Sequence, residues 1–225
     1  INPVAAVGLE ALNALAERKP KSRTVPAALK GLKEQLGPLE QLIAVTGLLR
    51  QRRQAAGSLD LNLPLPAIDS LGDLAVPGPD SALAGWLVSL EPHHPLALLR
   101  EAVLLADQAL GQHLATLELP AIYATNALAD PSDLNDVARA ALALDIPLEL
   151  SEEGNASAAE LAAAFAGTDR SRALQQQLQA ILKPIQLSTS PGPHALAGLL
   201  EEGAALVPWC CPTLHYADLW NQQLL

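Results

Sequence analysis

The fold of this chain is indicated best by two stretches near its carboxyl end, Ser188-Thr189-Ser190-Pro191-Gly192-Pro193-His194 and Cys211-Pro212-Thr213-Leu214-His215-Tyr216-Ala217-Asp218. The Pro-Gly-Pro triplet predicts a tight turn, because proline fixes φ and glycine accepts conformations that other residues avoid. The second stretch runs into an amphipathic segment, residues 216–225. We therefore expect a turn that ends at His194 and a helix that begins near Tyr216.

Composition favours a helix-rich domain. Half of the 225 residues are apolar, which is enough for a sizeable core, and aromatic residues make up only 3%. Alanine and leucine dominate, and they favour helices over sheets. We expect an α/β fold of the helix-rich α+β kind, in which several helices pack on short strands.

The sequence lacks the signals that mark secreted or membrane proteins. No apolar run reaches the roughly 18 residues that a membrane-spanning helix needs. The amino terminus does not resemble a secretory signal. We expect a cytoplasmic protein that does not bind membranes. Methionine is absent even at position 1, which we interpret as a fragment of a longer protein.

Charge divides the chain into two segments of opposite sign. Residues 1–53 hold nine basic and four acidic residues, a net charge of +5, whereas the remainder holds five basic and twenty acidic residues, a net charge of −15. An acidic surface repels nucleic acid, so the basic segment is the part with the right sign for RNA. We expect one partial domain, with a basic helical segment over residues 1–55 and an acidic helix-rich body over residues 56–225.

Hydrophobic spacing predicts the secondary structure. Helices are expected over 4–17, from Pro26, over 39–54, over 95–117, from Asp130, from Ser157 and over 169–183. Short strands are expected over 57–64 and 86–90, and residues 120–124 are expected to form a short strand or an extended turn. Gly37-Pro38 is expected to break a helix, and Ser157 with Glu160 predicts a capping box. The residues expected to face inward include Leu42, Ile43, Leu48, Leu49 and Leu105.

The two cysteines, Cys210 and Cys211, are adjacent. This spacing supports neither a disulfide framework within the chain nor a zinc site. We expect two partly buried thiols in a reducing compartment.

Three further segments extend the pattern of the opening stretches. They are Gly57-Ser58-Leu59-Asp60-Leu61-Asn62-Leu63-Pro64 after a basic helix end, Leu99-Arg100-Glu101-Ala102-Val103-Leu104-Leu105-Ala106-Asp107 followed by Leu119-Pro120-Ala121-Ile122-Tyr123, and Asp130-Pro131-Ser132-Asp133-Leu134 followed by Leu144-Asp145-Ile146-Pro147-Leu148. In this order the segments resemble the catalytic domain of ribonuclease II-type exoribonucleases, the RNB family. The resemblance covers roughly residues 40–225, the carboxyl-terminal part of that domain.

The resemblance implies a metal-dependent 3′-to-5′ exoribonuclease that hydrolyses single-stranded RNA to nucleoside monophosphates. The family binds magnesium through clustered aspartates of the type Asp-Pro-x-x-Ala-x-Asp-x-Asp-Asp, a motif that this chain lacks. Magnesium requires several oxygen ligands close together, so we expect no metal site in this chain and no hydrolysis by the isolated chain. The resemblance implies no DNA partner, and it does not indicate an oligomeric state.

The resemblance also identifies departures from the family pattern. The family has two basic residues where this chain has Leu214 and His215, an acid at Arg100, asparagine at Asp107 and often histidine at Asn126. A guanidinium at the basic pair would bind phosphate oxygens, which leucine cannot do. His215 therefore either keeps a weak phosphate contact and is the one candidate catalytic residue, or marks a site that has lost its function.

The remaining candidates for RNA contact each have a structural alternative. His194 could contact the RNA 3′ end or be a turn histidine bonded to the backbone. Tyr123, Trp209 and Tyr216 could stack on bases or pack in the core. The other three are Glu101, with a solvated helix face as the alternative, and Arg52 and Arg53, with a solvated helix end as theirs.

Three hypotheses about function remain from the sequence. The chain belongs to an active RNB exoribonuclease, to a catalytically degenerate RNB protein that binds RNA or regulates, or to a helical protein-interaction module without a nucleic-acid role. Magnesium-dependent shortening of RNA separates the first from the second. Salt-dependent RNA binding separates both from the third.

Overall fold

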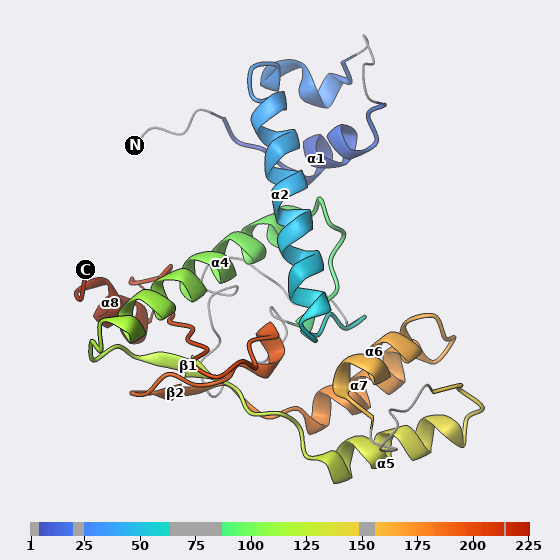
Figure 1. The fold of residues 1–225 in the computed structure, drawn as a ribbon. Helices are drawn as coiled ribbons and strands as arrows, with labels where there is room; N and C mark the ends of the chain where they lie inside the picture. The colour runs from blue at the N-terminus through green and yellow to red at the C-terminus, as the bar shows by residue number, and fades with distance from the viewer. Residues whose placement is uncertain (1–4, 20–24, 64–86, 149–155, 214) are drawn as a thin grey trace. The chain divides into compact units, whose positions relative to one another are not determined.

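The computed structural model describes residues 5–19, 25–63, 87–148, 156–213 and 215–225. The chain forms two compact units, residues 1–52 with 90–102 and residues 53–89 with 103–225. Two of the three boundaries between the units fall within long helices, α2 (Leu36–Ala55) and α4 (Pro95–Thr116), which Figure 1 labels. The helix-rich fold expected from composition is confirmed.

The first unit is built from α1 (Leu9–Ala16), the 3-10 helix η1 (Ala27–Leu32) and the first part of α2. Its core consists of buried side chains from α1 and η1, namely Ala11, Leu15, Leu29 and Leu32. The α-helix predicted from Pro26 is therefore a 3-10 helix. Gly37-Pro38 does not break a helix: it lies in the first turn of α2, where the missing N–H of proline has no intrahelical partner to lose.

Helix α2 exposes leucines that were expected to be buried. The exposed fractions are 42% for Leu42 and 66% for Leu48, whereas Thr46 is buried. The Thr46 hydroxyl donates to the carbonyl oxygen of Leu42 at 2.8 Å, so its burial leaves no unsatisfied donor. This part of α2 carries apolar residues on several of its sides. The spacing of these residues therefore did not indicate which side of the helix is buried.

The second unit contains the only named strands of the described residues. Strand β1 (Tyr123–Thr125) pairs antiparallel with β2 (Gln186–Ser188). A predicted strand over 120–124 thus corresponds to β1, whereas β2 was not predicted. In place of the predicted strands over 57–64 and 86–90, the described residues form one bridge between Leu61 and Val88; residues 64–86 lie outside the described part.

Side chains from several elements form the core of the second unit. These are Leu114 of α4, Ala121 and Tyr123 around β1, and Ala205 and Val207 of the carboxyl-terminal segment. The segment before the last helix, α8 (Tyr216–Gln222), thus packs directly on α4 and β1. Leu105 of α4 was expected in the core but is 47% exposed.

Three further helices belong to the second unit. Helix α7 (Ser171–Ile181) packs against both α5 (Pro131–Leu142) and α6 (Ala158–Ala166) (Figure 1). The predicted capping box at the start of α6 is confirmed: Ser157 Oγ accepts from the N–H of Glu160, whose carboxylate accepts from the N–H of Ser157. Within the described residues, every helix is too short or too polar to traverse a lipid bilayer.

Candidate nucleic-acid interface

Polar side chains of α8 bind the backbone of two neighbouring segments. The Asn221 amide nitrogen donates to the carbonyl oxygens of Ile122 at 2.9 Å and Pro208 at 2.8 Å, and its oxygen accepts from the N–H of Ile122 at 2.9 Å. Gln222 donates to the carbonyl of Trp209 at 2.8 Å. These bonds hold the loop before α8, of which residues 208–213 and 215 are described, against the start of β1.

Asp218 continues this contact at the beginning of α8. Its Oδ1 accepts from the N–H of Cys211 at 2.7 Å, and its Oδ2 lies 3.8 Å from Nδ1 of His215. The Asp218 side chain is 1% exposed, whereas His215 is 31% exposed. Burial raises the pKa of Asp218 above its ordinary value, while the Cys211 N–H and His215 lower it. One buried carboxylate therefore contacts both the loop and its histidine.

A second buried carboxyl group lies nearby on α4. Asp107 is 1% exposed, its carbonyl accepts from the N–H of Val207 at 3.1 Å, and its Oδ1 accepts from the Cys210 thiol at 3.5 Å. Burial raises the pKa of Asp107 to about 8, and the nearby Asp218 raises it further against the hydrogen bonds of Cys210 and the Trp209 backbone. Asp107 is thus mainly neutral at pH 7.

The two cysteines match the expectation of partly buried thiols. Cys211 is buried, and Cys210 is half-buried. Burial, together with the Asp107 carboxyl, raises the pKa of Cys210 to about 12. Burial also raises the pKa of Cys211, so the thiolate, which is the reactive form of cysteine, is disfavoured at both positions.

An aromatic pair on α8 consists of the exposed Tyr216 and the half-buried Trp220. Tyr216 is 71% exposed, and its ring centroid lies 6.5 Å from that of Trp220, with an interplanar angle of 34°. The Trp220 Nε1 donates to the carbonyl oxygen of Pro120 at 2.9 Å, which fixes the indole relative to β1. An anchored indole beside an exposed phenol ring is a surface on which a nucleobase can stack.

The other two aromatic candidates are less accessible. Tyr123 is 2% exposed and belongs to the core of the second unit, and burial raises its pKa. Trp209 is partly buried in the loop before α8. Of the three aromatic candidates for stacking, Tyr216 is thus the one that the structure exposes most.

His194 is fully buried at the turn predicted from Pro191-Gly192-Pro193. Its Nδ1 accepts from the N–H of Ala197 at 3.2 Å, and its backbone forms bridges to Asn126 and Leu199. Burial lowers the pKa of His194 to about 4, so the ring is neutral at pH 7. This geometry corresponds to the turn histidine that the sequence left as an alternative.

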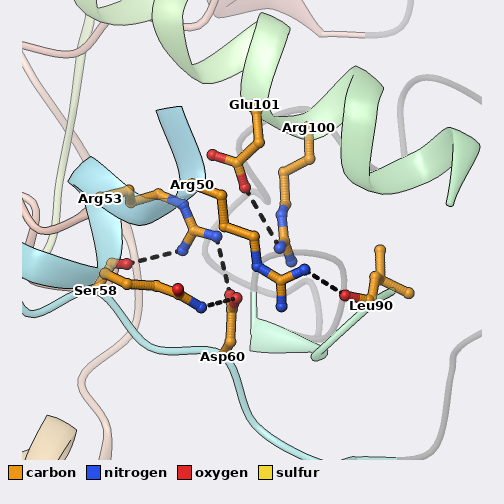
Figure 2. A network of polar contacts seen from close by, with 8 residues as sticks. Arg50, Arg53, Ser58, Asp60, Leu90, Arg100 and Glu101 are labelled. Carbon is orange, nitrogen blue, oxygen red and sulfur yellow. Dashed lines mark hydrogen bonds and ion pairs between the residues drawn. The ribbon is translucent and has the colours of Figure 1, made fainter. Parts of the chain in front are cut away.

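The neighbouring arginines at the end of α2 differ in their surroundings. Arg52 is exposed. Arg53 is buried, and its guanidinium donates to Ser58 Oγ at 2.8 Å and to Asp60 Oδ1 at 3.0 Å, as Figure 2 shows. Gln54 also donates to the Asp60 carboxylate at 2.9 Å. The charge of Arg53 is thus already paired within the second unit.

Glu101 is not on a solvated helix face. It is 3% exposed, and its Oε1 lies 3.5 Å from Nη2 of the equally buried Arg100 (Figure 2). In the same unit Arg50 donates to the carbonyl of Leu90. The solvated helix face that was the alternative for Glu101 is therefore wrong, because its carboxylate lies inside the protein next to the Arg100 guanidinium.

The described residues do not fit a magnesium site. Among them, no group of three or more histidine, cysteine, aspartate or glutamate side chains is placed to hold a metal ion. Asp107 and Asp218 are neighbours, but burial raises the pKa of Asp107 to about 8, so Asp107 is mainly neutral at pH 7 and is a poor ligand for magnesium. Several acids of the sequence, among them Asp69 and Asp73, lie outside the described residues, as does Leu214 of the opening stretch.

Sequence reasoning did not identify Trp220, Asn221 or the buried role of Asp107. The amphipathic segment after Tyr216 signalled the helix, and Asn221 stands one turn after Asp218 on it. Nothing local distinguished Asp107 from a solvated acid, because its burial depends on residues about a hundred positions away.

Comparison with known proteins defines the class. The RNB domain family matches the chain over residues 1–225. The chain therefore belongs to the RNB-domain family, as the motifs indicated. No curated protein sequence matches it.

Solved structures show the same fold. The structure is similar to Mycoplasma genitalium RNase R in complex with ribose-methylated single-stranded RNA (TM-score 0.58, 14% identity, 86% of this chain and 29% of that chain). It is also similar to the apo form (0.58, 12%, 91% and 30%) and to the complex with double-stranded RNA (0.56, 12%, 96% and 36%). The chain thus spans about a third of the length of these RNase R chains.

Proposed function

We propose that this chain is part of an RNB-type 3′-to-5′ exoribonuclease that hydrolyses single-stranded RNA to nucleoside monophosphates in the cytoplasm. The family match over the whole chain is the observation that carries this proposal. The likeness to part of RNase R supports a place within a larger catalytic domain. The family's magnesium would be bound by residues other than those described here, because the described acids do not form a site.

The surface around α8 is the part of the chain that we assign to RNA. Tyr216 and Trp220 offer ring faces to a base, and His215 stands beside them at the position of the family's basic pair. Arg52 is an exposed cation on the basic segment and is assigned to phosphate. His194, Tyr123 and Arg53 support the fold in this proposal, since each is buried with internal partners.

A second candidate is a degenerate RNB protein that binds RNA without cleaving it. Leu214 and His215 in place of two basic residues favour it, because a leucine cannot stabilise charge in the transition state. The two candidates share the RNA surface and differ in hydrolysis.

Hydrolysis is tested with the 225-residue chain and with a longer protein that includes an upstream aspartate motif. Each is incubated with magnesium and a 5′-labelled single-stranded RNA. We expect stepwise shortening by the longer protein and intact RNA with the chain alone. Intact RNA with both proteins would leave the degenerate binder as the function, and shortening by the chain alone would overturn the assignment of the metal to other residues.

A further inference from the structure

The two oxygens of the buried Asp218 carboxylate, which faces His215, differ in their hydrogen bonding. The Asp218 carboxylate has one bonded oxygen, Oδ1, and a buried Oδ2 without a hydrogen-bond partner among the described residues. The group nearest to it that can carry a positive charge is the His215 imidazole, with Nδ1 at 3.8 Å. A buried carboxylate oxygen is stabilised most when such a neighbour is protonated.

The imidazole of His215 is placed between this carboxylate and solvent. Nδ1 faces Asp218, and the side chain is 31% exposed. A neutral imidazole carries one N–H, so it cannot donate to an anion at each of its two nitrogens, whereas the imidazolium donates at both. The 3.8 Å between Nδ1 and Oδ2 is an ion-pair separation rather than a hydrogen bond, so a phosphate at Nε2 and the Asp218 carboxylate on the Nδ1 side together favour the protonated ring through charge.

We propose that His215 binds an RNA phosphate as an imidazolium held between that phosphate and Asp218, so that binding takes up a proton and Asp218 acts as the positioning residue. This inference rests on the RNA contact proposed above and deepens it. The protonated imidazole of His215 would take the place of the permanent positive charge that the family's basic pair carries. The expected consequence is RNA binding that tightens as pH falls.

The surrounding titratable groups come from three elements. The loop contributes His215, Cys210 and Cys211, α8 contributes Asp218, and α4 contributes Asp107. Burial raises the pKa of both thiols above its ordinary value, so they remain neutral through the relevant range. Asp107 lies beside Asp218 rather than beside the imidazole, and its contribution is separated below by a variant.

Asp218 also holds the loop, so a variant must separate its charge from its hydrogen bond. Asp218→Asn keeps an oxygen that can accept from the N–H of Cys211 and removes the negative charge that faces His215. Asp107→Asn removes the other titratable acid without changing the shape of the side chain. His215→Ala removes the phosphate contact, and Tyr216→Ala removes stacking area but no titratable base.

The experiment measures the affinity of the 225-residue chain for a labelled single-stranded oligouridylate at constant ionic strength, between about pH 5 and pH 8. We expect affinity to rise as pH falls, by at most about tenfold per pH unit for one proton. His215→Ala abolishes this dependence and weakens binding about tenfold at low pH. Asp218→Asn reduces the dependence, Tyr216→Ala weakens binding at every pH, and Asp107→Asn leaves the dependence intact.

The outcomes distinguish the inference from the function on which it rests. Binding with no pH dependence, or with equal dependence in His215→Ala, overturns the proton-coupled contact and leaves the RNA surface standing. Equal dependence in Asp218→Asn removes the positioning role. Absence of binding at every pH and at low salt contradicts the RNA contact itself.

Discussion

Gly111 of α4 and Ala205 of the carboxyl-terminal segment lie in direct contact. A β-carbon built on Gly111 would stand 2.7 Å from the carbonyl oxygen of Ala205 and 3.0 Å from Cα of Leu206. Both neighbours are backbone, which cannot rotate away as a side chain could. This contact lets the segment before α8 run along α4 and brings the loop with His215 to its place.

Replacement of Gly111 by alanine is predicted to destabilise the protein. The methyl group must displace backbone atoms of Ala205, and such overpacking costs about 1–3 kcal/mol. Gly47→Ala is the matched control, because Gly47 lies within α2 with no atom within 4 Å of the added carbon. It should stabilise by about 0.5–1 kcal/mol, since alanine is the better helix former. Urea denaturation compares the two; equal effects would argue against the close contact.

The stability of the second unit should decrease with rising pH because of Asp107. Burial raises its pKa from 3.8 to about 8 in the folded protein. Between these values the folded state holds a proton that the unfolded state lacks, so the free energy of unfolding falls by up to about 1.4 kcal/mol per pH unit. This contribution is complete below about pH 4 and is lost as pH rises through about 8.

Asp107→Asn removes this titration and keeps the shape of the side chain. We predict a higher melting temperature than wild type near neutral pH, with a gain that grows up to about pH 8. Asp169→Asn, at an exposed position, serves as the control and should change little. An Asp107→Asn variant that follows the wild-type pH profile would show that the carboxyl is ionised in the folded state.

The two neighbouring arginines of α2 should respond differently to truncation. Arg52→Ala removes an exposed charge, so we expect weaker RNA binding and a change in stability within about 0.5 kcal/mol. Arg53→Ala removes the partner of the buried Asp60 carboxylate and should cost about 3–5 kcal/mol. Thermal melts and RNA titrations measure both effects.

A double variant checks the cause of the Arg53 effect. Arg53→Met with Asp60→Leu removes both charges of the buried pair and should recover much of the lost stability. If it is as unstable as Arg53→Ala, packing or the Ser58 bond rather than the unpaired carboxylate accounts for the loss.

Sequence reasoning succeeded where structure is locally encoded. The capping residues Ser157 and Glu160 act within one turn, and the apolar spacing of α4 and α5 specifies each helix. Strand β2 could not be predicted, because its three residues depend on pairing with a strand about sixty residues earlier. The outward face of α2 was missed for a similar reason, since packing partners decide which of several apolar faces is buried.

The candidate site also combines residues that a local motif indicates with residues that only the tertiary structure brings together. His215 and Tyr216 were found because a family motif surrounds them, and the start of α8 was expected there. The anchoring of Trp220 by Pro120 joins residues a hundred positions apart, which no local pattern signals. The burial of the Glu101 and Asp107 side chains was not predicted, because acidic side chains usually lie on the surface.

Photo-cross-linking tests most directly whether the α8 surface contacts RNA. The 225-residue chain is irradiated with a single-stranded RNA that contains photoreactive uridines, and the linked peptides are identified by mass spectrometry. We predict cross-links to the peptide that contains Tyr216 and Trp220, which Tyr216→Ala reduces and excess unlabelled RNA removes. Cross-links confined to residues 1–53, or none to α8, would contradict the account.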